Sequence, residues 1–123
     1  MSLPRIQQIQ EYLQETPDDP FWIYALANEY VSQGADDEAE PLFRRLINSH
    51  SDYLATYYQY AKLCERHSNT EQALILYKDG MKLAKNKTDN KTFRELSDAH
   101  QNLLYESWNN TLYQSRNRSN PTS

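Results

Sequence analysis

The stretch DDPFWIYALANEYVSQG, residues 18–34, contains the signals for a whole helix and for both of its ends. Asp19 can cap the helix and Pro20 suits its first turn, whereas Gly34 suits a helix stop. The apolar side chains between these ends recur at the spacing of one helix face, at Ile23, Leu26, Ala27 and Tyr30. A short helix with a single apolar stripe is stable only when that stripe is covered, so another part of the chain must cover it.

The sequence supplies such a partner more than once, because it matches itself when it is shifted by 34 positions. Each copy contains a helical pattern, a polar break and a second helical pattern. The equivalent pairs are Ile23 and Tyr57, Leu26 and Tyr60, Ala27 and Ala61, Ala39 and Ala73, and Phe43 and Tyr77. The same shift backward gives a partial copy, in which Phe43 falls on Ile9. We therefore expect the helix after Pro20 to pack antiparallel to a helix over 37–49.

A helix–turn–helix unit of this length with the pattern W-x2-L-G-x2-Y…A-x3-F…P resembles the tetratricopeptide repeat. At the positions of this pattern the first full copy has Ile23, Leu26, Ala27, Tyr30, Ala39 and Phe43. Both copies lack the tryptophan and the helix-ending proline, whose place is taken by Ser51 in the first copy and by Lys85 in the second. The second copy departs from the pattern most, because it also has Gly80 late in its second helix. The resemblance covers residues 3–107, and it implies a stack of antiparallel helices whose concave face receives a ligand.

The sequence predicts an all-α fold, a short solenoid or superhelix of six helices. Their expected ranges are 3–15, 20–33, 37–49, 53–67, 70–85 and 91–108. Residues 1–108 form a single domain, with a half repeat (3–19), two full repeats (20–53 and 54–87) and a capping helix (91–108). Ser68 with Glu71, and Thr92 with Glu95, can form capping boxes. Residues 109–123 are expected to be a flexible polar tail, because they carry few apolar side chains.

The predicted core follows from the repeat pattern. Small residues suit the points where two helices cross closely, and larger apolar residues fill the space around the crossings. The residues that we expect to be buried are Leu26, Ala27, Ala39, Phe43, Tyr60, Ala61, Ala73 and Tyr77.

Composition excludes several classes of function. A net charge of −4 disfavours binding to nucleic acid, and the sequence has no apolar run of the roughly 18 residues that a membrane span requires. The single Cys64 and the absence of a signal-like first segment predict a cytoplasmic protein. The three histidines, His50, His67 and His100, lack metal-ligand spacing, and no nucleophile or phosphate-binding motif occurs. We therefore expect no cofactor, no metal and no enzymatic activity.

Tyrosine is unusually frequent for a chain of this length, with ten residues. Tyr24 and Tyr58 occupy equivalent positions of the two full repeats and fall on the stripe that resembles the concave surface of tetratricopeptide repeats. Extending this stripe by helical spacing predicts a groove that binds a protein or an extended peptide. Its expected contact residues are Tyr24, Asn28, Tyr58, Gln59, Lys62 and Arg66. Lys62 and Arg66 are one turn apart and would favour an acidic partner.

Some tetratricopeptide domains of co-chaperones grip a terminal carboxylate with lysine, arginine and asparagine side chains. Asn28 matches one of those asparagines, and Gln59 stands in place of another. Tyr24 replaces the first lysine, and residues 91–107 offer no clear match to the remaining pair. The sequence therefore does not predict this carboxylate clamp.

Self-association is the alternative function. Residues 1–53 carry three arginines against ten carboxylates, whereas residues 54–87 carry six basic groups against three acidic ones. Two molecules could pair through these oppositely charged halves or stack through their helix ends, which would give a weak homodimer. The molecular mass at several salt concentrations distinguishes this alternative from peptide binding.

Overall fold

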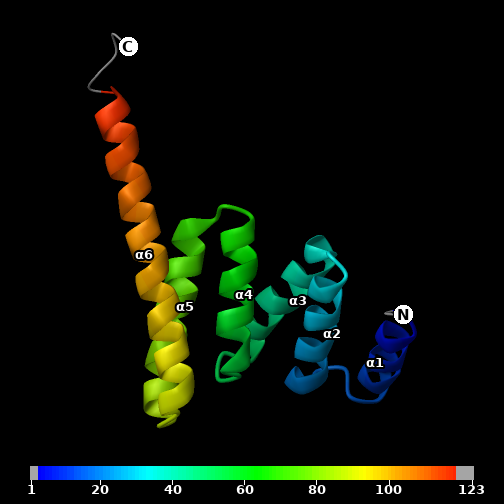
Figure 1. Ribbon diagram of the computed structural model, residues 1–123. Coiled ribbons are helices and arrows are strands. Elements are labelled where there is room, and N and C mark those ends of the chain that lie inside the picture. The colour runs from blue at the N-terminus through cyan, green and yellow to red at the C-terminus, as the bar shows by residue number, and fades with distance from the viewer. Residues whose placement is uncertain (1–2, 119–123) are drawn as a thin grey trace.

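The computed structural model of the protein describes residues 3–118, and these residues form six helices without a strand. The helices are α1 (Leu3–Glu15), α2 (Pro20–Ser32), α3 (Asp36–Ser49), α4 (Ala55–Arg66), α5 (Thr70–Asn86) and α6 (Asn90–Arg118). Successive helices run up and down along one row (Figure 1). This arrangement confirms the predicted all-α solenoid. None of the described helices combines the length and the apolar character that crossing a membrane requires.

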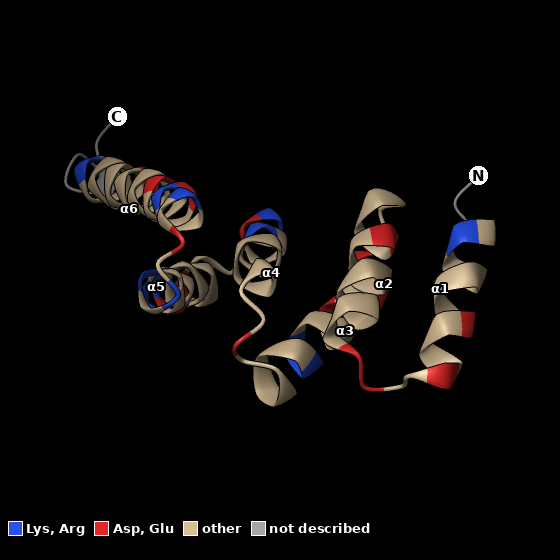
Figure 2. Cartoon of the chain, turned by 90° about the horizontal axis from the view of Figure 1, so that it is seen from below, with Lys and Arg blue, Asp and Glu red and all other residues tan. Residues whose placement is uncertain are grey.

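The helices pack mainly against their neighbours in sequence, as in other stacked repeats. Within each full repeat the two helices form an extensive contact, α2 with α3 and α4 with α5, and α6 covers α5. The contact between α3 and α4, which joins the two repeats, is the smallest between successive helices. Figure 2 shows α2, α4 and α6 along one side of the stack and α3 and α5 along the other.

Three turns repeat the same backbone geometry. Gly34, Ser68 and Thr88 have positive φ angles of 75°, 61° and 57°, and Ser68 is the equivalent of Gly34 in the second repeat. In each turn the next amide donates to the carbonyl five residues earlier, from Ala35 to Tyr30 (2.8 Å), from Asn69 to Cys64 (2.8 Å) and from Asp89 to Ala84 (2.9 Å). This 6→1 hydrogen bond is typical of a helix stop with a left-handed residue. The 34-residue period of the apolar side chains therefore also relates the backbone conformations of Gly34 and Ser68.

This geometry corrects one predicted helix start. Asp19 caps α2 as expected, because its side chain accepts from the amide of Phe21 at 3.0 Å. The capping box of Ser68 with Glu71 is wrong, since Ser68 occupies the left-handed position of the turn. Asn69 caps α5 instead, and its side chain accepts from the amide of Gln72 at 3.3 Å.

Replacing Ser68 with glycine is expected to stabilise the fold by about 0.5–1 kcal/mol. A left-handed conformation costs a residue with a Cβ roughly 1–2 kcal/mol, and the greater freedom of glycine in the unfolded chain offsets part of this gain. Urea unfolding of the variant measures the change. Ser49→Gly, at an exposed position in right-handed helix, is the matched control and should give no gain. Equal effects of the two substitutions would contradict strain at residue 68.

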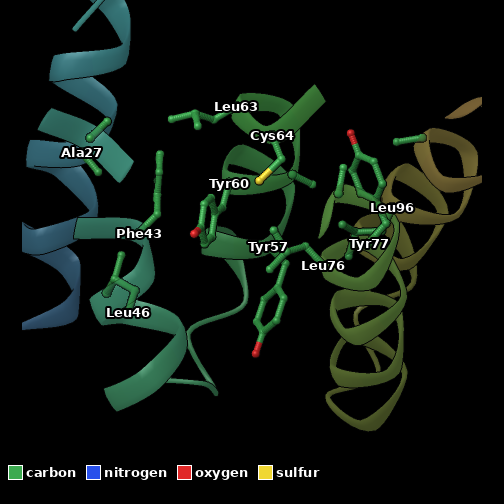
Figure 3. Packing of buried hydrophobic residues seen from close by; sticks show 14 of the residues in the cluster. Ala27, Phe43, Leu46, Tyr57, Tyr60, Leu63, Cys64, Leu76, Tyr77 and Leu96 are labelled. Atoms are coloured by element: carbon green, nitrogen blue, oxygen red, sulfur yellow. The ribbon is translucent and has the colours of Figure 1, made fainter. Parts of the chain in front are cut away.

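The core confirms the predicted buried set, since all eight residues have relative exposures of 6% or less. Phe43 is at the centre, where its ring stacks on Tyr60 with 5.6 Å between centroids (Figure 3). A second, smaller cluster of Ile6, Ile9 and Leu26 joins α1 to α2. α1 thus packs against α2 at the first end of the stack, and its origin as a half repeat stays a prediction.

Gly80 explains why the second repeat departs from the family pattern. A Cβ atom at this position would lie 2.7 Å from Cβ of Tyr57 on α4 and 3.0 Å from Cδ1 of Leu96 on α6. Real Cβ atoms do not approach other atoms so closely, so α4, α5 and α6 converge on the space that glycine leaves. The equivalent residue of the first repeat is the fully buried Leu46, and Tyr57 occupies the position of Ile23. Compared with the first repeat, the second has a larger side chain on its first helix (Tyr57 for Ile23) and a smaller residue on its second helix (Gly80 for Leu46).

The last helix corrects the predicted chain end. We expected a helix over 91–108 and a tail over 109–123, but α6 continues to Arg118. Once a helix has formed, each added residue gains a hydrogen bond, so polar composition alone does not end it. Leu103 is the last buried residue among those with described side chains. The flexibility of residues 109–118 stays a prediction, which amide hydrogen exchange would test, and residues 119–123 lie outside the described residues.

Candidate protein-binding groove

A hollow lies between α2, α4 and the beginning of α6. Its volume is about 400 Å³, which is within the range of sites for small ligands or peptide side chains. The residues that line it are Tyr24, Leu54, Ala55, Tyr58, Gln59, Thr92 and Glu95. The structure thus brings three of the six expected contact residues, Tyr24, Tyr58 and Gln59, to one hollow.

The two tyrosines are held in place by the core beneath them. The ring of Tyr24 lies edge-on to Phe43 at 6.5 Å and 5.6 Å from the ring of Tyr53. The ring of Tyr58 lies edge-on to Tyr77 at 6.2 Å. Both side chains are half-buried, so one part of each ring contributes to packing and another part lines the hollow. Such fixed rings offer apolar contact at low entropic cost.

Asn28 and Lys62 lie one helical turn beyond the tyrosines and outside the lining of the hollow. Both are half-buried. The ammonium group of Lys62 is 5.5 Å from the ring centroid of Tyr58 and 3.6 Å from Oε2 of Glu65. These contacts hold Lys62 at the rim, beside one of the two tyrosines.

Arg66 lies outside the lining of the hollow and forms an ion pair, so its contact with a ligand stays a prediction. Its Nε and Nη2 atoms each lie 3.2 Å from a carboxylate oxygen of Asp36 at the start of α3. Nε2 of His67 lies 2.8 Å from the same carboxylate. The hydrogen bond from Arg66, with a smaller contribution from His67, lowers the pKa of Asp36 below its usual value despite the opposing effect of burial. Arg66 therefore joins the two repeats, and Lys62 is the remaining cation of the expected set near the tyrosines.

The beginning of α6 contributes two groups that sequence reasoning missed. Asp89 caps α6, because its carboxylate accepts from the amide of Thr92 at 3.0 Å and from the hydroxyl at 2.9 Å. These bonds lower the pKa of Asp89. The predicted capping box of Thr92 with Glu95 is therefore wrong, and both side chains line the hollow instead. The one sequence signal for them was their place in the first two turns of a helix that follows the second repeat.

Two further reactive side chains, His50 and Cys64, lie outside the lining of the hollow. His50 ends α3 and its Nε2 atom lies 3.1 Å from Oδ1 of Asp18, which also pairs with Arg45 at 3.0 Å. Burial raises the pKa of the Cys64 thiol to about 11, so it stays protonated at neutral pH. Within residues 3–118 no group of three His, Cys, Asp or Glu side chains is placed to hold a metal.

Comparison with solved structures finds similar helical repeats. The chain is 37% identical to a tetratricopeptide repeat domain protein from Salinibacter ruber in its solution structure, which covers 71% of this chain and 88% of that one with a TM-score of 0.68. A crystal structure of the tetratricopeptide repeat domain protein from Salinibacter ruber gives 36% identity, coverage of 70% and 96%, and a TM-score of 0.68.

A protein from Bordetella parapertussis has the same fold at 18% identity, with coverage of 82% of this chain and 88% of that chain and a TM-score of 0.71. No protein-family model matches the sequence, and no curated protein matches it at a significant level. The likeness to the Salinibacter ruber domain extends over almost the whole of that domain.

Proposed function

Because the chain belongs to the tetratricopeptide repeat family, whose repeats generally serve protein interaction, we propose that it binds an extended peptide segment of another protein. The proposed site is the groove built on Tyr24, Tyr58 and Gln59. One observation carries this proposal. Side chains from α2, α4 and α6 enclose a hollow of about 400 Å³, and tyrosines at equivalent repeat positions form two of its walls.

The chemistry of the hollow defines the ligand. The tyrosine rings favour apolar side chains, and Gln59 and Thr92 can exchange hydrogen bonds with a peptide backbone. Lys62 at the rim favours a carboxylate, as the sequence suggested. Glu95, the one charged side chain in the lining, favours a basic group at the other side of the hollow. A peptide that carries both charges would match the groove best. Two repeats offer a short groove, so we expect an affinity on the order of micromolar.

The proposal is of a non-enzymatic module without a cofactor or nucleic-acid ligand. The histidines at the ends of α3 and α4 are paired with Asp18 and Asp36, which supports a structural role for them. A cytoplasmic location is also proposed, and the single, buried Cys64 is consistent with it.

Head-to-tail association through the charged halves has less support than peptide binding. The ion pair of Arg66 with Asp36 joins the two oppositely charged halves within one molecule, so it removes one charge from each half that a second copy could otherwise pair with.

The test is a double variant, Tyr58→Ala with Lys62→Glu. Peptides selected from a random library against the unmodified protein serve as the probe, and fluorescence polarisation measures their affinity. We expect the double variant to bind the selected peptides at least about tenfold more weakly, because it loses one aromatic wall and reverses the charge at the rim.

A matched double variant, Tyr12→Ala with Lys82→Glu, makes the same chemical changes at exposed positions outside the groove and should bind normally. Circular dichroism and thermal unfolding of both variants establish that they are folded. Equal affinity of the two variants for the selected peptides would refute the groove as the binding site.

A further inference from the structure

The second half of α6 carries an exposed apolar surface that the peptide groove does not use. We call it the α6 stripe, and its residues are Leu104, Tyr105, Trp108, Leu112 and Tyr113. Their relative exposures are 46%, 63%, 62%, 44% and 67%. These five are among only eight large apolar side chains that are exposed in the described part of the chain. Large apolar side chains that gather in this way mark interaction surfaces.

No other helix of the described structure covers the α6 stripe. α6 has 29 residues and α5 has 17, so at 1.5 Å per residue α6 continues for roughly 18 Å beyond the start of its antiparallel neighbour. Figure 1 shows this part of α6 extending past α5 and α4. Trp108 is also roughly 140° around the helix axis from the buried Leu103. The stripe therefore faces away from α5.

The pattern of the α6 stripe is self-complementary. Leu104 and Leu112 lie four residues before and four residues after Trp108, on one helix face. When two such helices pair antiparallel about Trp108, each Leu104 meets Leu112 of the second copy and the two Trp108 rings meet at the axis. A two-fold interface requires this correspondence, because the same patch must match itself.

The charge and the area of the stripe also fit a second copy. Residues 104–115 contain one charged side chain, Glu106, so two copies can approach with little repulsion, and the surface offers nothing to select a strongly charged partner. With about 150–250 Å² for each aromatic side chain, the exposed parts of the three rings amount to roughly 300–500 Å². With the leucines included, the two copies together would bury on the order of 1,000 Å² of surface, which is the size of the smallest specific interfaces.

We infer that α6 is a dimerisation helix, which pairs antiparallel with α6 of a second copy through Leu104, Trp108 and Leu112. Burial of apolar area drives this association, so it differs from the pairing of charged halves that the sequence alone suggested. The dimer leaves Tyr24 and Tyr58 uncovered, because the stripe and the groove are separate surfaces.

Sedimentation velocity of the full chain over a range of concentrations tests this inference. We expect a monomer of 14.5 kDa at low concentration and a dimer above a Kd on the order of 10–100 μM, which suits a small interface. Raising the salt concentration should leave the dimer intact, whereas a dimer of charged halves would dissociate. A monomer at all concentrations would overturn the inference.

Two double variants test the antiparallel pairing. Leu104→Glu with Leu112→Glu places like charges opposite each other, so the dimer should be lost. Leu104→Lys with Leu112→Glu places Lys opposite Glu, so it should weaken the dimer less than the first variant does, because an exposed ion pair replaces only part of the lost apolar contact. In a parallel pair the second variant would oppose Lys to Lys and Glu to Glu. Equal weakening of the dimer by the two variants would overturn the proposed pairing.

Asn102→Glu with Asn110→Glu is the control for added negative charge, because both positions are exposed on α6 and lie roughly 120° or more around the helix axis from Trp108. It should dimerise normally, and so should the groove variant with Tyr58→Ala and Lys62→Glu. Helicity measured by circular dichroism confirms that each variant is folded before its mass is compared.

Discussion

Replacing Phe43 with alanine is expected to lower the free energy of unfolding by about 3–5 kcal/mol, which is the range for removing a fully enclosed aromatic ring. The side chain has no exposed surface. Its ring stacks on Tyr60 with an interplanar angle of 18° and meets the edge of Tyr24. The substitution therefore leaves a cavity at the junction of α2, α3 and α4. Urea unfolding measures the loss, through the midpoint and the slope of the transition.

Phe21→Ala is the matched control for this experiment. Phe21 is 54% exposed at the start of α2 and contacts the edge of Trp22. Its removal creates no internal cavity, so we expect a loss of less than about 1 kcal/mol. A loss below about 1 kcal/mol for Phe43→Ala as well would mean that residue 43 does not lie in the core.

The second large effect is expected from Gly80→Ala. Helix propensity alone predicts a gain of about 1 kcal/mol from this change. The new Cβ would lie 2.7 Å from Cβ of Tyr57, an atom next to the backbone that no rotation of a side chain can move away. The helices must separate, and such overpacking typically costs about 1–3 kcal/mol. After subtraction of the gain from helix propensity, we therefore expect a net loss of up to about 2 kcal/mol in the free energy of unfolding.

Lys82→Ala is the matched control, because Lys82 is exposed on the same helix and its replacement by alanine creates no clash. Lys82→Ala should change the free energy of unfolding by less than about 0.5 kcal/mol. Greater stability of Gly80→Ala than of the unmodified protein would show that α4 and α5 do not cross closely at this point. It would also remove our explanation of the irregular second repeat.

The repeat period made most of the fold predictable. Alanines that recur with large apolar residues indicate which faces meet, and a solenoid needs contacts only between neighbours. The end of α6 was not predictable in this way, because its last turns make no core contact that the apolar pattern could reveal. The role of Gly80 was not predictable from the repeat pattern either, because it depends on the size of Tyr57, which lies on another helix.

The candidate groove was predictable only in part. Tyr24 and Tyr58 follow from the repeat, and Gln59 follows from helical spacing. Arg66 is placed by Asp36, which is 30 residues away in sequence and is not related to it by the period. The place of Glu95 in the lining depends on which residue caps α6. Asp89 and Thr92 are both chemically suitable caps. Local patterns could not decide between them.

The contact between α3 and α4 is the smallest between successive helices, yet a single buried cluster runs through it. Phe43 of α3 stacks on Tyr60 of α4, and the hydroxyl of Tyr60 donates to Glu40. The hydrogen bond from Arg66 to Asp36 closes the same joint at the end of α4. Tyr24 precedes the joint and Tyr58 follows it, so these contacts fix the separation of the two rings. The width of the groove is therefore set by the core, and a ligand would meet a site that is already formed before it binds.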